Sequence, residues 1–164
     1  MRARLLHEDG GERTFALAFE SGERLMEGLR RFAAEEELGA SEFHAIGALQ
    51  EATIAFFDWT TKSYRQMAIR TQVELLSLTG HVTLPADEEA EGERNLHVHC
   101  VLGRRDGTAS GGHLVEAVVR PTCEVVLTEL PAHLARRKDP ESGLPLIAPE
   151  VEVESPGRFR SPGG

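Results

Sequence analysis

The feature that most constrains the fold is a long succession of strand-like segments that begins shortly after residue 40. These segments are rich in Val, Ile, Leu, Thr and Phe, and turn residues separate each one from the next. They span residues 43–58, 63–71, 73–84, 95–103, 109–119 and 123–130. Because consecutive strands joined by short turns pair in an antiparallel way, the pattern predicts a largely antiparallel sheet.

The first forty residues add two further strands and one helix. Residues 2–8 and 12–20 flank a turn at Gly10, and the second of these segments alternates apolar residues along its length. A helical stripe of apolar residues follows between Ser21, read as the N-cap, and Gly39, read as the C-cap. One amphipathic helix of about four turns beside such a sheet predicts an α+β fold.

The chain length is that of a single domain. The sequence has 164 residues, of which 40% are hydrophobic and 27% charged, an ordinary globular composition. The last 34 residues, from Pro131 onward, contain six of the eight prolines. We therefore expect a domain over residues 1–131. Residues 132–164 form a Pro-rich C-terminal tail that packs partly, as far as Val151 or Val153, and is then disordered.

Two further features predict the compartment. No apolar run approaches the roughly 18 residues of a membrane helix, and the N-terminus lacks the apolar segment of a signal peptide. The two cysteines, Cys100 and Cys123, lie in apolar strand-like segments without a CxxC spacing. This pattern predicts reduced, buried thiols in a cytoplasmic protein with no membrane partner.

The charge balance bears on partners. The chain has 18 Lys and Arg against 27 Asp and Glu, a formal net charge of -9, which disfavours non-specific binding to nucleic acid. Two short basic clusters stand out, at residues 104–105 and 136–138. Each is either solvated surface charge or a contact for an anion or an acidic partner.

Three of the seven histidines belong to one expected hairpin. His97 and His99 alternate along the first strand, so their side chains share a face. If Gly103 and Ala109 close the turn, His99 lies directly opposite His113, and His97 lies on the diagonal. Cross-strand Cβ atoms are about 4.5–5.5 Å apart and diagonal ones about 7–8 Å apart, so the three imidazoles converge.

Three converging imidazoles predict a metal site, with zinc as the expected ion. A three-histidine zinc site leaves a fourth position for water, a carboxylate, a substrate or a residue of another subunit. The alternative is a set of hydrogen-bonding histidines beneath a subunit interface. His81 is a possible accessory residue, as a fourth ligand or a group behind the ligands, or an ordinary packed histidine. The glycine pair before His113 permits a close backbone approach or a bulge.

Several motifs in the same order resemble the plants-and-prokaryotes conserved (PPC) domain, over roughly residues 3–131. They are IGALQEATI (46–54), FD (57–58), KSY (62–64), ELLSLTG (74–80), LHVH (96–99), GGHL (111–114) and EVV (124–126). The resemblance implies a compact α+β domain with a curved, mainly antiparallel sheet, and a homotrimer. Some prokaryotic members look able to bind zinc through the histidines that match His97, His99 and His113, so the resemblance also implies a zinc site at these three residues.

The resemblance leaves the biochemical role open. In plants this domain follows AT-hooks that bind DNA, but the present chain has no Arg-Gly-Arg-Pro hook core, and residues 71–73 lack the Gly-Arg-Phe of the plant pattern. The first hypothesis is a homotrimeric, metal-binding regulatory module whose small-molecule ligand the sequence does not identify. The second is an enzyme that uses zinc-activated water, with Glu51 or Glu116 as the base or orienting group. The third is a DNA-binding protein, which the net charge opposes.

The expected trimer also has a physical reason within the chain. Residues 109–130 are nearly continuously apolar, and one helix cannot cover a sheet of six or more strands. The uncovered apolar face would be an association surface. Three-fold closure is one of the symmetric arrangements that buries such a surface.

Overall fold

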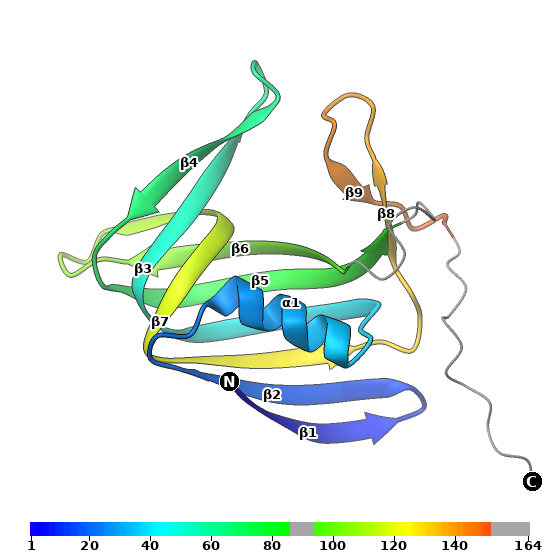
Figure 1. Cartoon of the computed structure of the whole chain (residues 1–164). Coiled ribbons are helices and arrows are strands. Elements are labelled where there is room, and N and C mark those ends of the chain that lie inside the picture. Colours follow the sequence, from blue (N-terminus) through cyan, green and yellow to red (C-terminus); the bar gives the residue numbers. More distant parts are fainter. Residues whose placement is uncertain (86–93, 152–164) are drawn as a thin grey trace, which may run out of the picture.

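A computed structural model describes residues 1–85 and 94–151 of the chain (Figure 1). The elements, in order, are β1 (Arg2–Asp9), β2 (Glu12–Glu20), α1 (Leu25–Glu35), β3 (Ala40–Asp58), β4 (Ser63–Ile69), β5 (Val73–Pro85), β6 (Asn95–Gly103), β7 (Ala109–Glu129), β8 (Ala135–Lys138) and β9 (Pro145–Ile147). The α+β fold class with one main helix is confirmed. Among the described strands, β5 with β8 is the one parallel pair, and the others are antiparallel.

The sheet runs in the order β1-β2-β7-β3-β5-β8-β9, with β4 paired to β3, and β6 paired to both β5 and β7. Figure 1 shows that the sheet is strongly curved and that the β3–β4 hairpin projects away from the rest of it. The short β8–β9 hairpin projects on the same side. Helix α1 lies across one face of the sheet, away from the two projecting hairpins, and its apolar side chains join the hydrophobic core.

The predicted start of the helix is wrong. The helix begins at Leu25 with Arg24 at the N-cap position, and no side chain of the cap residue bonds the first turn. Ser21 instead donates a hydrogen bond of 3.2 Å to the Pro121 carbonyl. The Glu116 carboxylate on β7 takes over the capping role, because it accepts a 3.0 Å hydrogen bond from the Met26 backbone N–H.

The predicted end of the helix is also wrong. The last helical residue is Glu35, and Glu37 takes the left-handed conformation, with a φ of 53°. Gly39 therefore is not the cap. A Cβ at Gly39 would lie 2.3 Å from Nδ1 of His133, so the glycine is needed for a close approach between two segments.

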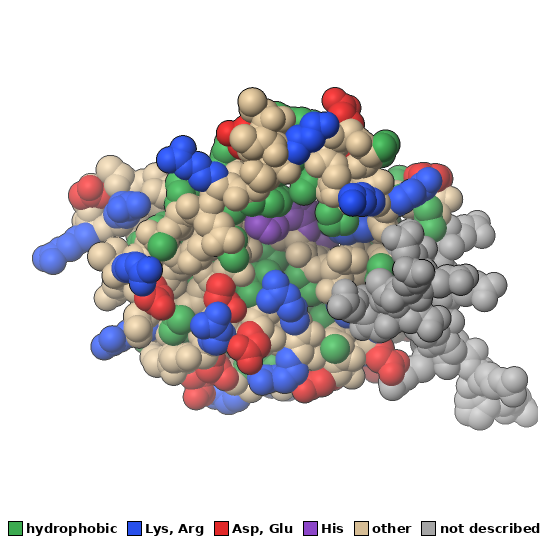
Figure 2. Space-filling model, turned by 45° about the horizontal axis from the view of Figure 1, so that its top comes forward, with side chains coloured by type: hydrophobic (Ala, Val, Ile, Leu, Met, Phe, Trp, Pro, Cys, Tyr) green, Lys and Arg blue, Asp and Glu red, His purple; other side chains and the backbone are tan. Residues whose placement is uncertain are grey.

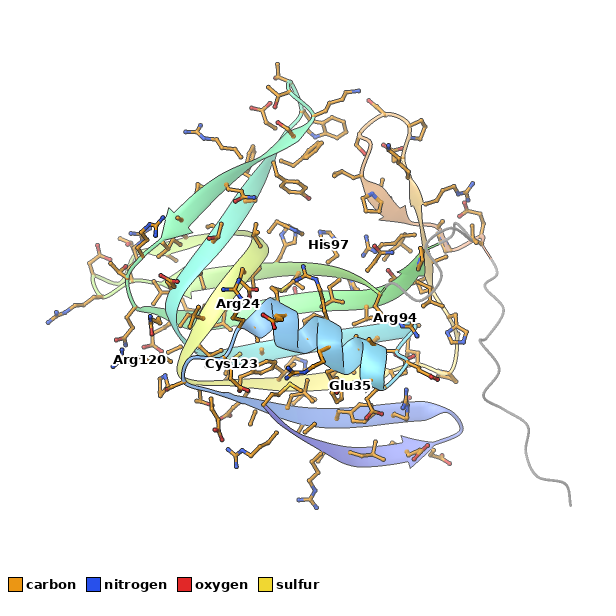
Figure 3. The ribbon with its side chains drawn as sticks, in the orientation of Figure 1. Arg24, Glu35, Arg94, His97, Arg120 and Cys123 are labelled. Atoms are coloured by element: carbon orange, nitrogen blue, oxygen red, sulfur yellow. The ribbon has the colours of Figure 1, made fainter. Side chains whose placement is uncertain are left out.

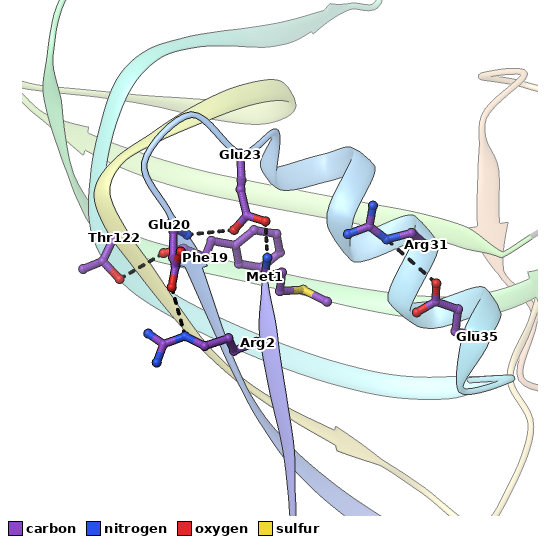
Figure 4. A network of polar contacts seen from close by, with 8 residues as sticks. All are labelled: Met1, Arg2, Phe19, Glu20, Glu23, Arg31, Glu35 and Thr122. Atoms are coloured by element: carbon purple, nitrogen blue, oxygen red, sulfur yellow. Dashed lines mark hydrogen bonds and ion pairs between the residues drawn. The ribbon is translucent and has the colours of Figure 1, made fainter.

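The start of the chain is tied to the segment that leads into the helix (Figure 4). The Met1 amino group pairs with the Glu23 carboxylate, which also accepts a 2.8 Å hydrogen bond from the Glu20 backbone N–H. The N-terminal amine is the main cause that lowers the pKa of Glu23. Arg2 pairs with Glu20 at 3.0 Å. These contacts anchor the edge strand β1, whose side chains are otherwise exposed.

The two strands expected at residues 109–119 and 123–130 are one continuous strand, β7. Proline removes a ladder donor, which is why the sequence suggests a break at Pro121. The proline is tolerated because it lies at an irregularity: Val119 opposes Leu49 and Cys123 opposes Gly47, so residues 120–122 have extra length over β3.

Both thiols behave as the sequence predicts. Cys100 and Cys123 are free and buried. Burial raises the pKa of Cys100 to about 11 and that of Cys123 to about 12, so neither is a ready nucleophile at neutral pH.

The first part of the Pro-rich tail packs onto the sheet edge. Strand β8 continues the sheet beside the end of β5, with Ala135 opposite Leu84. Ala135 and Ala148 are buried by this arrangement. The expected disorder at the end of the tail lies outside the described residues. No helix in the described part of the chain is long and apolar enough to span a membrane.

Candidate metal centre

The hairpin β6–β7 has the register that the sequence predicts. Gly103 opposes Ala109 across the turn, and His99 opposes His113. The polar turn of residues 104–108 is closed by a 2.8 Å hydrogen bond from the Arg104 N–H to the Thr108 carbonyl. This register brings histidines from two strands onto one face.

The three imidazoles meet at short range. The Nε2 atoms of His97 and His99 are 3.1 Å apart. The ring centroids are 4.9 Å apart for His97 and His99, 5.3 Å for His97 and His113, and 5.5 Å for His99 and His113. One ring nitrogen from each residue lies within 4.8 Å of the other two. Within the described residues, this is the one group of three or more potential ligands at such distances.

Strand alternation sets this centre apart from the core. Val98 and Cys100 belong to the buried hydrophobic core, so His97 and His99 occupy the opposite face of β6. Figure 3 shows His97 between the two projecting hairpins. In the space-filling view, histidine side chains lie at the base of a hollow with hydrophobic side chains around them (Figure 2).

The glycine pair before His113 allows two close backbone approaches. A Cβ on Gly111 would lie 2.7 Å from the Cys100 carbonyl oxygen, and one on Gly112 would lie 2.7 Å from that of Ala55. Real Cβ atoms do not come that near to a backbone oxygen, so both glycines are required for this packing. Of the two roles expected for Gly111 and Gly112, the close backbone approach is confirmed. It lets β7 pack tightly against β6 and β3 next to His113.

The β3–β4 hairpin contributes an aromatic wall. The Tyr64 ring lies 4.9 Å from the His113 ring with a 31° tilt between their planes. Phe57 contacts both Tyr64, at 5.3 Å, and Trp59, at 5.6 Å, in edge-to-face geometry. At the hairpin tip, Lys62 donates to the Glu141 carbonyl of the β8–β9 hairpin. The two hairpins therefore meet above the histidines.

The neighbourhood favours neutral imidazoles. Burial is the main cause that lowers the pKa of His97 to about 4, and the positive charge of Arg136 is the next. Burial also lowers the pKa of His113. Because a metal binds the neutral ring, a histidine that stays unprotonated is well suited as a ligand.

The other candidate residues lie outside this group. His81 on β5 is directly opposite His97, exposed, and on the same face. Glu51 is exposed on β3. Glu116 is occupied elsewhere, because its carboxylate caps α1 and accepts a 3.1 Å hydrogen bond from Nη2 of Arg24. Glu51, Glu116 and Arg24 line a cavity that none of the three histidines lines.

The donor set fits a zinc ion. Tetrahedral zinc with Zn–N distances of about 2.05 Å places pairs of nitrogens about 3.3 Å apart, close to the separation of the His97 and His99 nitrogens. Nδ1 of His113 is buried and has no hydrogen-bond partner in the described structure. A metal ion or a bound water would satisfy such an orphaned nitrogen.

The comparisons with known proteins agree with the motifs. Residues 6–131 match the model of the Plants and Prokaryotes Conserved (PCC) domain, which is also abbreviated PPC. The chain belongs to this family. Its PPC fold is shared by a structure from Pyrococcus horikoshii described as a plant- and prokaryote-conserved protein, which is 28% identical. That match has a TM-score of 0.75 and covers 93% of this chain and 97% of the other.

Two further PPC-like structures carry functional descriptions. A metal-containing protein from Archaeoglobus fulgidus is 31% identical, with a TM-score of 0.75, and the match covers 90% of this chain and 99% of the other. A protein from Bacteroides thetaiotaomicron, provisionally described as DNA-binding, is 26% identical, with a TM-score of 0.79 and coverages of 91% and 99%. No curated protein matches the chain.

Proposed function

We propose that this PPC-family protein is a homotrimeric binding or regulatory module that holds zinc through His97, His99 and His113. The observation that carries the proposal is the convergence of one nitrogen from each histidine to within 4.8 Å of the others. A relative at 31% identity is described as metal-containing, which supports a metal in this fold. When bound, zinc would supply an electrophilic centre with one open position for an anionic or neutral ligand atom.

Zinc is proposed over other ions because of the donor set. Three imidazoles without a thiolate or carboxylate suit zinc, copper, iron or nickel, and not magnesium or calcium, which take oxygen ligands. Zinc is chosen among these because three histidines with an open fourth position are a common donor set for zinc. The competing explanation is a plain hydrogen bond between the two rings, which needs no metal.

Elemental analysis of untagged protein separates these explanations. We expect about one zinc per chain after equilibration with zinc and removal of the excess, and a loss of at least a hundredfold in affinity in His99→Ala. His7→Ala is the matched control, because His7 lies exposed on β1. His81→Ala tests the accessory residue, and a weaker zinc affinity would assign it a supporting role. Less than about 0.1 zinc per chain in the wild-type protein contradicts the proposal.

The trimer is supported by the apolar side chains that the fold leaves exposed. Phe56 is 67% exposed, Trp59 61% and Met67 41%, and all three belong to the β3–β4 hairpin. Exposed apolar clusters of this kind are typical of subunit contacts. Light scattering should give about three times the chain mass of 18.0 kDa. A stable monomer at low concentration would contradict this part of the proposal.

DNA binding is the second candidate, because the Bacteroides relative is provisionally described as DNA-binding. The formal charge of -9 per chain opposes it, since phosphate contacts supply most of the affinity of such complexes. A mobility-shift assay at about 50 mM salt is the test. A shift that weakens steeply with added salt would establish this function, and the absence of a shift would remove it.

A further inference from the structure

Arg136 is the buried charge that the three-histidine centre does not explain. The residue is only 6% exposed. Its Nε donates a 3.0 Å hydrogen bond to Oγ1 of Thr83, and its Nη1 donates a 2.9 Å bond to the Pro145 carbonyl. Its Nη2 is also buried but has no hydrogen-bond partner. No carboxylate in residues 1–85 and 94–151 forms an ion pair with it.

Such a group calls for an anion. A buried guanidinium without a counter-ion loses its hydration and gains no compensating charge, which is costly. The two satisfied nitrogens hold the planar group in a fixed orientation, and the third, Nη2, has two N–H groups without a partner. Thr83, which fixes this orientation, is itself fully buried. The guanidinium is thus a preorganised donor.

Arg136 lies at the edge of the histidine face. Thr83 and His81 are two residues apart on β5, so their side chains share a face, and His81 is directly opposite His97. Thr83, which orients the guanidinium, is therefore about 7 Å along β5 from His81, the residue directly opposite His97. In agreement, the charge of Arg136 acts on His97 and helps to lower its pKa.

The surroundings restrict the anion that would fit. Inorganic phosphate is usually held by several donors at once, whereas the free donor here is one guanidinium nitrogen. The ring of Tyr64, which lies against His113, and the ring of Phe57 behind it present aromatic carbon. This combination of one charged donor and an apolar wall suits an organic acid.

We propose that Arg136 is the anion-binding residue of a ligand site shared with the three-histidine centre, and that the ligand is a small organic carboxylate. The carboxylate accepts a hydrogen bond from Nη2 of Arg136, and its apolar remainder lies toward Tyr64. With zinc bound, an oxygen of the same ligand would face the position that the three histidines leave open. The metal half of this site rests on the proposed function, whereas the Arg136 half rests on the protein's own contacts.

Butyrate is a suitable probe, and butyramide is its neutral isostere. Each is titrated by calorimetry into zinc-equilibrated and chelator-treated protein, and ¹⁵N-arginine NMR follows the Arg136 side chain. We expect butyrate to bind with a Kd on the order of 1 mM, and butyramide at least tenfold more weakly. The Arg136 Nε resonance should shift with butyrate. Chelation should weaken butyrate binding several-fold without abolishing it.

Variants of two neighbouring arginines provide the matched comparison. Arg136→Gln should weaken butyrate binding at least tenfold and leave the zinc content unchanged. Arg137→Gln should alter neither, because Arg137 is 53% exposed on the next residue of β8 and pairs with Glu150. If Arg136→Gln does not fold, the comparison of butyrate with butyramide and the Arg136 resonance in the wild-type protein decide the question.

The outcomes separate this proposal from the proposed function. Equal binding of butyrate and butyramide, or unchanged butyrate affinity in Arg136→Gln, overturns the carboxylate site even if zinc binds. Tighter binding of inorganic phosphate than of butyrate overturns the assignment to an organic acid. Butyrate binding that depends on Arg136 in a protein that takes up no zinc supports the Arg136 site and contradicts only the metal centre.

Discussion

Strand β6 carries two opposite kinds of surface on its two faces. On one face Val98 and Leu102 are fully buried in the hydrophobic core. On the other face His97 and His99 lie close to His113, whose buried Nδ1 has no hydrogen-bond partner among the described residues. The same backbone and register serve both. One face contributes buried apolar volume to the core, and the other carries potential metal ligands. Substitutions on the first face should therefore change stability, and those on the second should change metal binding.

The largest effect on stability is expected on the core face. Leu102→Ala removes a side chain with no solvent exposure, and it should lower the free energy of unfolding by about 2–5 kcal/mol. Urea unfolding of the chelator-treated protein measures this. Because the substitution touches no histidine, zinc uptake of the folded protein should remain the same. A loss of zinc binding in Leu102→Ala would show that the two faces are not independent.

The histidine face should show the reverse behaviour. Zinc at a hundredfold excess over its Kd should stabilise the wild-type protein by about 2.7 kcal/mol. His113→Ala should lose this increment, whereas its chelator-treated form should unfold within about 1 kcal/mol of the wild type. Unfolding curves with and without zinc, for the wild type, for His113→Ala and for Leu102→Ala, measure the zinc increment on each face. A zinc increment that survives in His113→Ala would contradict the assignment of that ligand.

The sequence predicts the histidine pair better than its surroundings. The register of His99 and His113 follows from local facts: the turn at Gly107, the alternation of strands and the apolar residues between the histidines. The limits of helix α1 do not, because its first turn is capped by Glu116, which is far away in the chain. The capping preferences of Ser21 and Gly39 depend only on the local sequence, so they do not reveal a capping group as distant in the chain as Glu116.

The role of Arg136 illustrates what sequence patterns omit. Its cluster at residues 136–138 is equally consistent with solvated surface and with an anion contact. Only the parallel pairing of β8 with β5 brings Arg136 onto Thr83 and buries it. Likewise, the contact of Tyr64 with His113 depends on the bend of the β3–β4 hairpin. Long-range pairings of this kind leave no periodic signal in the sequence.

The next effect in size concerns Gly112, where β7 packs closely against β3. Gly112→Ala would place a Cβ 2.7 Å from the Ala55 carbonyl oxygen, so β7 and β3 must move apart. We expect a loss of about 1–3 kcal/mol in the free energy of unfolding, together with weaker zinc binding, because His113 is the next residue. Gly107→Ala is the contrasting variant: it meets no atom within 4 Å, and its cost comes only from its φ of 83°. It should leave zinc affinity unchanged, and calorimetric zinc titrations of both variants measure the contrast.

The smallest effect should appear as a pH dependence confined to the histidine face. The pKa of His97 is lowered from 6.5 to about 4 in the folded protein, chiefly by burial. Between these two pH values His97 is protonated in the unfolded chain but neutral in the folded protein. Its contribution to the free energy of unfolding is therefore fully present above pH 6.5 and is lost as the pH falls toward 4. Since His97 is partly solvated, we expect a loss of about 1–2 kcal/mol over this interval in chelator-treated protein. His97→Gln remains neutral and should flatten that part of the curve, whereas Leu102→Ala should shift the whole curve downward without changing its slope. An unchanged slope in His97→Gln would mean that the proton is taken up by another group, and the contrast between the two faces would then rest on the metal alone.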